Sequence, residues 1–166
     1  DGVKVSYAMG SGFSEADEHE KAKAMALAEE SDVIVAVVGG SSSRFGGAVF
    51  DANGAASKGT GSRSMDCGEG MDTAKVHIPA AQEELIAALA RLGKPLVTVV
   101  IAGRAYCIEK IENASDAVLY AFYPGPMGGR AVAELLYGSS NPSGRLPVSM
   151  PRHVGQIPVC YNYRTS

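Results

Sequence analysis

The chain has 166 residues, of which 46% are hydrophobic and 20% are charged, and its formal net charge is −3. A chain of this length and composition can bury one sizeable core, so we expect a single folded domain. The slightly acidic balance gives no basic surface, which argues against nucleic acid or an anionic membrane as the main partner. No apolar run approaches the roughly 18 residues that a membrane span requires.

The first third of the chain predicts a strand, a helix and a second strand. Val3 to Tyr7 has the pattern of a short strand. Ser14, with Asp17 three residues later, resembles a capping box for a helix that continues to about Glu30. The unbroken apolar run from Val33 to Val38 is typical of a parallel strand that is buried on both faces.

Strand and helix signals continue to alternate after a long loop. Pro79 opens a helix that Gly93 stops. The remaining predicted elements are strands at Leu96 to Ile101 and Ala117 to Phe122, a short helix near Ala105 to Glu112, and a helix from Gly128 to Tyr137 with Val132, Leu135 and Leu136 facing inward. This order predicts an α/β fold, with a doubly wound, mostly parallel sheet in an α/β/α sandwich.

The loop of residues 39 to 77 is the segment of greatest chemical interest. A loop longer than about 15 residues inside a compact domain is either functional or disordered. Its segment Cys67-Gly68-Glu69-Gly70-Met71-Asp72 holds two carboxylates three residues apart, and glycines on both sides leave Glu69 unshielded. A carboxylate held in this way can give or take a proton, although it is one half of most acid/base machinery. A solvated surface insertion is the alternative interpretation of this loop.

Several short motifs follow one another in the order found in one known family. They are Gly68-Glu69-Gly70-Met71-Asp72, Ile78-Pro79-x-x-Gln82-x-x-Leu85-Ile86, Gly93-Lys94-Pro95-Leu96, Gly103-Arg104, Tyr123-Pro124-Gly125-Pro126-Met127-Gly128-Gly129 and Asn141-Pro142-Ser143-Gly144-Arg145-Leu146-Pro147. The last motif, which continues through Pro151-Arg152 and Gln156-Ile157-Pro158, is the most specific. Over essentially its whole length, the chain resembles the C-terminal (second) α/β domain of glycoside hydrolase family 3, the β-glucosidase and β-xylosidase type.

The resemblance implies a retaining, exo-acting β-glycosidase that removes terminal β-linked sugars. In that family, an N-terminal barrel domain supplies an aspartate nucleophile, and the second domain supplies a glutamate as general acid/base. The two carboxyl groups of a retaining enzyme lie about 5–5.5 Å apart. Glu69 matches the glutamate of the family's Gly-Glu-Gly-x-Asp segment and so inherits the acid/base role. Asp72 matches the aspartate of that segment, which is expected to orient the loop and is also a candidate for substrate binding. Asp51 and Asp66 are the next carboxylates of the loop to consider.

Two departures from the family pattern accompany this resemblance. Thr73 stands where the family commonly has an arginine, so any ion pair made by that arginine is lost. Residues 1–166 contain no counterpart of the barrel or of its nucleophile. The first strand–helix unit of the second domain also has no counterpart, because Val3 to Tyr7 resembles the second strand of that domain. We therefore expect a single, incomplete C-terminal domain that is inactive alone, with an unpaired strand edge. Its expected partners are a β-linked oligosaccharide or glycoside and the barrel domain. Whether the enzyme forms a homo-oligomer stays an open question.

Other candidate sites are weaker. Arg44 and Phe45 follow the Val33 to Val38 strand and are candidates to contact a sugar hydroxyl and ring face. The histidines His19, His77 and His153 show no ligand spacing, so we expect neither a metal nor a cofactor. The three cysteines, Cys67, Cys107 and Cys160, are widely spaced and favour free thiols in a reducing, cytoplasmic compartment.

Two alternative functions remain open from the sequence. In the first, the domain is a non-catalytic sugar-binding or interface module in which Glu69 only hydrogen-bonds a ligand. In the second, it is a flavodoxin-like domain that binds an anion or a nucleotide, because backbone N–H groups of Gly39-Gly40-Ser41-Ser42-Ser43 can cradle an anion after a buried strand.

Overall fold

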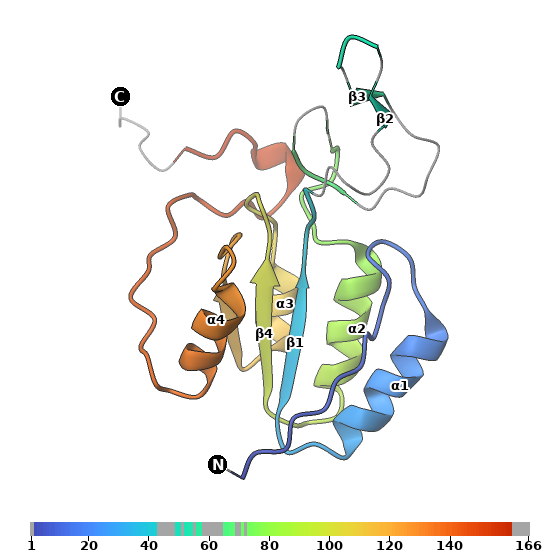
Figure 1. Ribbon diagram of the computed structural model, residues 1–166, viewed down its shortest axis with the longest axis vertical. Coiled ribbons are helices and arrows are strands. Elements are labelled where there is room, and N and C mark those ends of the chain that lie inside the picture. The colour runs from blue at the N-terminus through green and yellow to red at the C-terminus, as the bar shows by residue number, and fades with distance from the viewer. Residues whose placement is uncertain are drawn as a thin grey trace.

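The computed structural model describes residues 2–42, 49–50, 52–54, 56–57, 65–68, 71 and 73–160. Within these residues, the main sheet contains β1 (Ile34–Gly39), β4 (Leu96–Ile101) and β5 (Ala117–Tyr120) in the order β1-β4-β5. Both pairings are parallel, as the valine-rich runs predict. All three strands therefore end at the same edge of the sheet, the upper edge in Figure 1. We refer to it as the carboxyl edge.

Helices lie on both faces of this sheet. The helices are α1 (Glu18–Glu29), α2 (Ala80–Ala90), α3 (Glu109–Ala114) and α4 (Gly128–Leu136). α2 packs against both α1 and α3, and Figure 1 shows α3 behind the sheet and α4 on its nearer side. The prediction of a doubly wound, mostly parallel α/β fold is confirmed. α3 begins later than expected, because the chain between β4 and α3 first pairs with the end of the long loop, where Cys107 N–H donates to Val76 O at 2.6 Å.

The core lies between the sheet and the α1–α3 layer. It includes Ile34, Ala36 and Val38 of β1, Ile86 and Leu89 of α2, Leu96 and Val100 of β4, and Ile111 of α3. On the other face of β1, Val35 and Val37 are 45% and 61% exposed, so the prediction that this strand is buried on both faces is wrong. The physical reason is the position of α4, which lies at the β5 side of the sheet and does not cover β1 (Figure 1).

The inward face predicted for α4 is correct for part of the helix. Val132 and Leu135 are partly buried, whereas Leu136 at the end of the helix is 39% exposed. After α4, the chain runs without regular structure until the short 3₁₀ helix η1 (Val154–Gln156), which lies near the carboxyl edge (Figure 1). The thiol of Cys107 donates to the carbonyl of Arg152 at 2.9 Å and so ties this segment to the domain.

The strand predicted at Val3 to Tyr7 is not formed. Val3, Val5 and Tyr7 are 67%, 77% and 87% exposed, and this segment has no strand pairing. An alternating pattern is compatible with a strand but does not ensure pairing, and this segment does not pair with any strand of the sheet. Within the described residues, β1 pairs with β4 alone, so its outer edge is open, as expected from the sequence.

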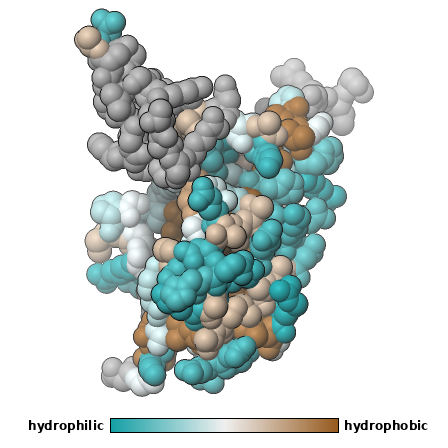
Figure 2. Space-filling model, turned by 90° about the vertical axis from the view of Figure 1, so that its right-hand side faces the viewer, coloured by the Kyte–Doolittle hydropathy of each residue, from teal (hydrophilic) through white to brown (hydrophobic). Residues whose placement is uncertain are grey.

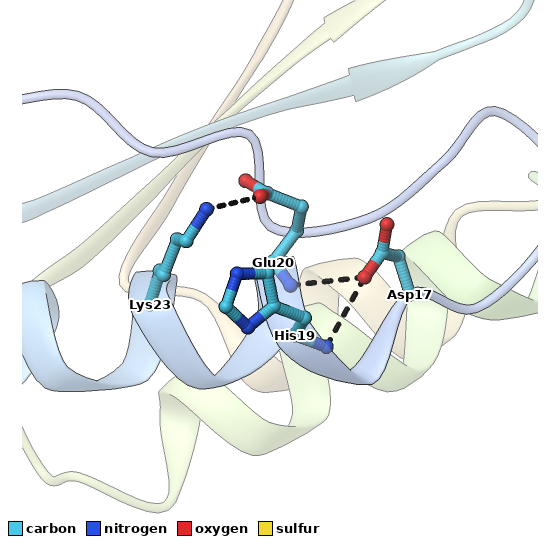
Figure 3. Close-up of polar contacts among 4 residues, drawn as sticks. All are labelled: Asp17, His19, Glu20 and Lys23. Carbon is cyan, nitrogen blue, oxygen red and sulfur yellow. Dashed lines mark hydrogen bonds and ion pairs between the residues drawn. The ribbon is translucent and has the colours of Figure 1, made fainter.

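α1 begins one turn later than the capping box predicts. The side chain of Asp17 accepts hydrogen bonds from the backbone N–H groups of His19 and Glu20 at 3.1 and 3.0 Å, which makes Asp17 the N-cap in place of Ser14 (Figure 3). Lys23 and Glu20 form an ion pair at 2.5 Å on the next turn. Figure 2 shows hydrophilic side chains gathered over the outer side of this helix.

The long loop contains a small element that the sequence did not predict. β2 (Val49–Phe50) pairs antiparallel with β3 (Ala56–Ser57) above the carboxyl edge in Figure 1. Across the described ranges, no helix combines the length and the apolar character needed to cross a bilayer.

Candidate functional site

Residues that follow the three main strands converge on one short stretch of the long loop. Ser41 follows β1, Tyr106 follows β4 and Tyr123 follows β5. Each of them contacts Asp66 or Cys67. Because parallel strands end at one edge of the sheet, segments far apart in the sequence meet there, which is where α/β folds place their ligand sites. The stretch that they hold lies immediately before Gly68 and Glu69.

Asp66 is anchored through both carboxylate oxygens. Its Oδ1 accepts the backbone N–H of Ser41 at 2.9 Å, and its Oδ2 accepts the hydroxyl of Tyr106 at 2.5 Å. The backbone N–H groups of Asp66 and Cys67 both donate to the carbonyl of Ser41, at 2.9 and 3.2 Å. Asp66 is therefore fixed by its side chain and its backbone to the segment that follows β1. A carboxylate engaged in this way serves as an anchor, and it is a weak candidate for acid/base chemistry.

The closeness of this contact requires glycine at position 40. A Cβ atom on Gly40 would lie 2.1 Å from the hydroxyl oxygen of Tyr106 and 2.8 Å from Oδ1 of Asp66. Any other residue would displace Tyr106 or Asp66. The glycine pair after β1 thus leaves room for the tyrosine–aspartate contact.

Cys67 is held by the residue that follows β5. Cys67 is 4% exposed, and its thiol lies 3.3 Å from the hydroxyl of Tyr123. Phe122 has a φ of 51°, a conformation that costs free energy for a residue with a side chain, and it directs the chain into Tyr123. A Cβ atom on Gly103 would lie 2.6 Å from the Tyr123 ring, so glycine is also required there. Strain of this kind at the end of a strand is typical of functional sites.

Gln82 supports the other side of the carboxyl edge. Its side-chain oxygen accepts the N–H of Gly39 at 2.7 Å, and its amide group donates to the carbonyls of Phe13 and Gly39 at 2.8 and 3.1 Å. Gln82 is buried, so these bonds satisfy polar groups that would otherwise have no hydrogen-bond partner. The glutamine of the Ile78-Pro79-x-x-Gln82 motif therefore fixes the end of β1.

Burial raises the pKa of three tyrosine hydroxyls near the carboxyl edge. Burial, and then the hydrogen bond and charge of Asp66, raise the pKa of Tyr106. Burial also raises the pKa of Tyr120 to about 12, and it raises the pKa of Tyr123, with a further contribution from the hydrogen bond to Cys67. Each hydroxyl therefore remains neutral at physiological pH. Tyr106 can act as a constant donor to Asp66.

The residues predicted to touch the substrate lie outside the described residues. This applies to Glu69, Asp72, Arg44 and Phe45, and also to Asp51, so their positions remain predictions. The structure does describe Cys67 and Gly68, which directly precede Glu69, and Met71, whose N–H donates to the carbonyl of Gly68 at 3.2 Å.

Within the part of the chain that the structure describes, the contacts of Thr73, the departure from the family pattern, are local. Its hydroxyl donates to the carbonyl of Lys75 at 3.1 Å and accepts the N–H of Lys75 at 3.2 Å. It therefore stabilises a turn just after Asp72.

Sequence reasoning assigned no role to Tyr106 and Tyr123, and it considered Ser41 only as part of the anion-binding alternative. The one available signal was their position, because each lies within a few residues of a predicted strand end. Gly103-Arg104 and Tyr123-Pro124 also belong to the motifs that carry the family resemblance.

Three of the five residues proposed to cradle an anion have backbone N–H groups that are already engaged, and Ser43 lies outside the described residues. The N–H of Gly39 donates to Gln82, that of Gly40 to the carbonyl of Ile101 at 3.1 Å, and that of Ser41 to Asp66. These backbone groups are therefore not available to cradle a phosphate. Among the described residues, no three histidine, cysteine, aspartate or glutamate side chains lie close enough together to hold a metal ion.

The fold and this site define an α/β enzyme domain with a glycine-rich loop that is anchored through Asp66 and Cys67 at the carboxyl edge of its sheet. The chain belongs to glycosyl hydrolase family 3, since residues 4–166 match the family's sequence profile described as "Glycosyl hydrolase family 3 C-terminal domain".

Related proteins of known sequence or structure agree with this assignment. The chain is 40% identical over 141 residues to the periplasmic β-glucosidase of Salmonella typhimurium, covering 85% of this chain and 16% of that protein. It is 34% identical over 159 residues to a β-xylosidase of Formosa agariphila, covering 96% and 19%. The crystal structure of a β-glucosidase from Listeria innocua in complex with glucose superposes with a TM-score of 0.73 and 32% identity, covering 91% and 18%. The chain thus spans less than one fifth of the length of each of these three relatives.

Proposed function

We propose that this chain is part of a retaining β-glycosidase, in which it supplies Glu69 as the general acid/base. The partner is an N-terminal barrel domain of the same enzyme, which supplies the nucleophile. The substrate is a glycoside or oligosaccharide with a terminal β-linked sugar, of the glucose or xylose type that the names of the relatives indicate.

One observation carries the proposal. Residues that follow all three main strands hold Asp66 and Cys67, and the next residues in the sequence are Gly68 and Glu69. A general acid has to lie within hydrogen-bonding distance of the leaving oxygen, so the backbone that carries it has to be fixed. A solvated surface insertion needs no such anchoring, and this favours the catalytic interpretation of the loop.

The proposed chemistry divides one reaction between two carboxyl groups. In the first step, the carboxylate of the barrel attacks the anomeric carbon while Glu69 protonates the departing oxygen. In the second step, Glu69 as carboxylate removes a proton from water, which attacks the glycosyl-enzyme intermediate. Two inversions give a product with retained configuration. Asp72 is proposed to orient the loop, and Arg44 and Phe45 to contact the sugar.

The stereochemistry of the product tests this function. We expect the full-length enzyme to hydrolyse aryl β-glucosides or β-xylosides and to release the β-anomer first, as followed by proton NMR before mutarotation. First release of the α-anomer would show an inverting reaction and contradict the proposal. Sugar binding without turnover, measured by calorimetry on the same preparation, would instead favour the non-catalytic module.

A further inference from the structure

The contact between Tyr106 and Asp66 is built more rigidly than an ordinary surface hydrogen bond. Tyr106 is 1% exposed and is among the largest fully buried side chains of the domain. Its hydroxyl meets Asp66 at 2.5 Å, over a glycine whose replacement would collide with both groups. Because Tyr106 follows β4 and Ser41 follows β1, Asp66 is held from two neighbouring strands at once.

The chain runs from this anchor directly to the proposed acid/base. Asp66 and Cys67 are fixed through their backbone N–H groups, and Gly68 has a φ of 113°, which glycine adopts without strain. Two residues therefore separate the anchored carboxylate from Glu69. The direction in which the backbone leaves Cys67 therefore limits the positions that the side chain of Glu69 can reach.

We propose that Tyr106 and Asp66 are positioning residues for Glu69, which goes beyond the acid/base assignment and rests on the proposed function. Neither residue exchanges a proton with the substrate. The tyrosine hydroxyl holds the aspartate, the aspartate holds the loop, and the loop aims the general acid at the leaving oxygen. Because catalysis by a positioned group falls steeply with misplacement, a displacement of about 1 Å is enough to cost up to about 10²-fold in rate.

Tyr106→Phe in the full-length enzyme tests the proposal, since it removes one hydroxyl and keeps the buried ring. We expect kcat/KM for an alkyl glycoside, a poor leaving group, to fall by about 10- to 10²-fold, with little change for a dinitrophenyl glycoside. In the Glu69→Ala background, the same substitution should cause no further loss, because residues that act as one unit are not additive.

Tyr120→Phe is the matched control. Its hydroxyl donates to the carbonyl of Arg104, and it is also partly buried at the end of β5, but it makes no hydrogen bond to Asp66. We expect this variant to leave the ratio of the two kcat/KM values unchanged. Should Tyr106→Phe fail to fold, Asp66→Asn gives a second route to the same measurement, with the same expected loss and the same dependence on leaving group.

The possible outcomes distinguish the positioning role of Tyr106 and Asp66 from the acid/base assignment of Glu69. Equal losses on both glycosides, or a loss that multiplies with that of Glu69→Ala, would overturn the positioning role while leaving the acid/base assignment intact. If Glu69→Ala itself shows no dependence on the leaving group, the proposed function fails and the positioning role fails with it.

Discussion

Replacing Glu69 with alanine in the full-length enzyme is expected to lower kcat/KM for glycosides with poor leaving groups by about 10²–10⁴-fold, the usual contribution of general acid/base catalysis. Dinitrophenyl glycosides need little proton assistance when the bond breaks, so their kcat/KM should change far less. The measurement is a series of aryl and alkyl glycosides of increasing leaving-group pKa, in which the loss should grow with that pKa.

Glu69→Gln is the shape-matched control, because it keeps the size of the side chain and removes the transferable proton. It should reproduce the dependence on leaving group seen with alanine. Equal losses across the series for both variants would demote Glu69 to a residue that positions the substrate. Asp51 would then be the first carboxylate to test, since both oxygens of Asp66 are already engaged.

Gly39→Ala is expected to destabilise the fold severely, by about 4 kcal/mol or more. Gly39 has a φ of 149°, and a Cβ atom there would lie 1.8 Å from the carbonyl oxygen of Ile101 on the neighbouring strand. The backbone of β4 cannot move away without breaking the pairing between the two strands. The loss would appear as a lower midpoint in urea unfolding followed by circular dichroism.

Gly129→Ala is the matched control for this substitution. Gly129 lies in the first turn of α4, with no atom within 4 Å of a Cβ atom placed there. Because alanine favours a helix over glycine by up to about 1 kcal/mol, the control should be neutral or slightly stabilising. Unfolding of the two variants at the same urea concentration would contradict the close approach of β1 and β4 at the carboxyl edge.

The elements that the sequence predicted best are those whose signal is local. The valine runs of β1 and β4 and the apolar periodicity of α2 each specify an element within a few residues of its observed bounds. Pro79 and Gly93 mark the ends of α2 because their backbone preferences act at that position alone.

The errors arise where tertiary structure decides. Val3 to Tyr7 alternates as a strand does, but the alternation contains no information on whether the segment pairs with a neighbouring strand. The apolar run of β1 predicted burial on both faces, while Val35 and Val37 depend on a helix that lies over other strands. At the start of α1, Ser14 and Asp17 are both good caps, and only the backbone conformation selects Asp17.

The candidate site was predictable in part. Glu69 was selected as the candidate acid/base from its glycine neighbours and from the family motif, both of which are local. The residues that hold the loop at Asp66 and Cys67 were not identified from the sequence, because Tyr106 lies 40 residues from Asp66 and Tyr123 lies 56 residues from Cys67. Contacts over such separations follow from the order of the strands, which places three distant segments at one edge of the sheet.

The rescue of Glu69→Ala by azide tests the central claim most directly. Azide attacks the glycosyl-enzyme intermediate without a general base, so it should restore turnover of a dinitrophenyl glycoside in this variant and leave the unsubstituted enzyme unaffected. The product should be a glycosyl azide of β configuration, identified by NMR. Absence of rescue, or a glycosyl azide of α configuration, would contradict the assignment of Glu69 as the acid/base of a retaining β-glycosidase.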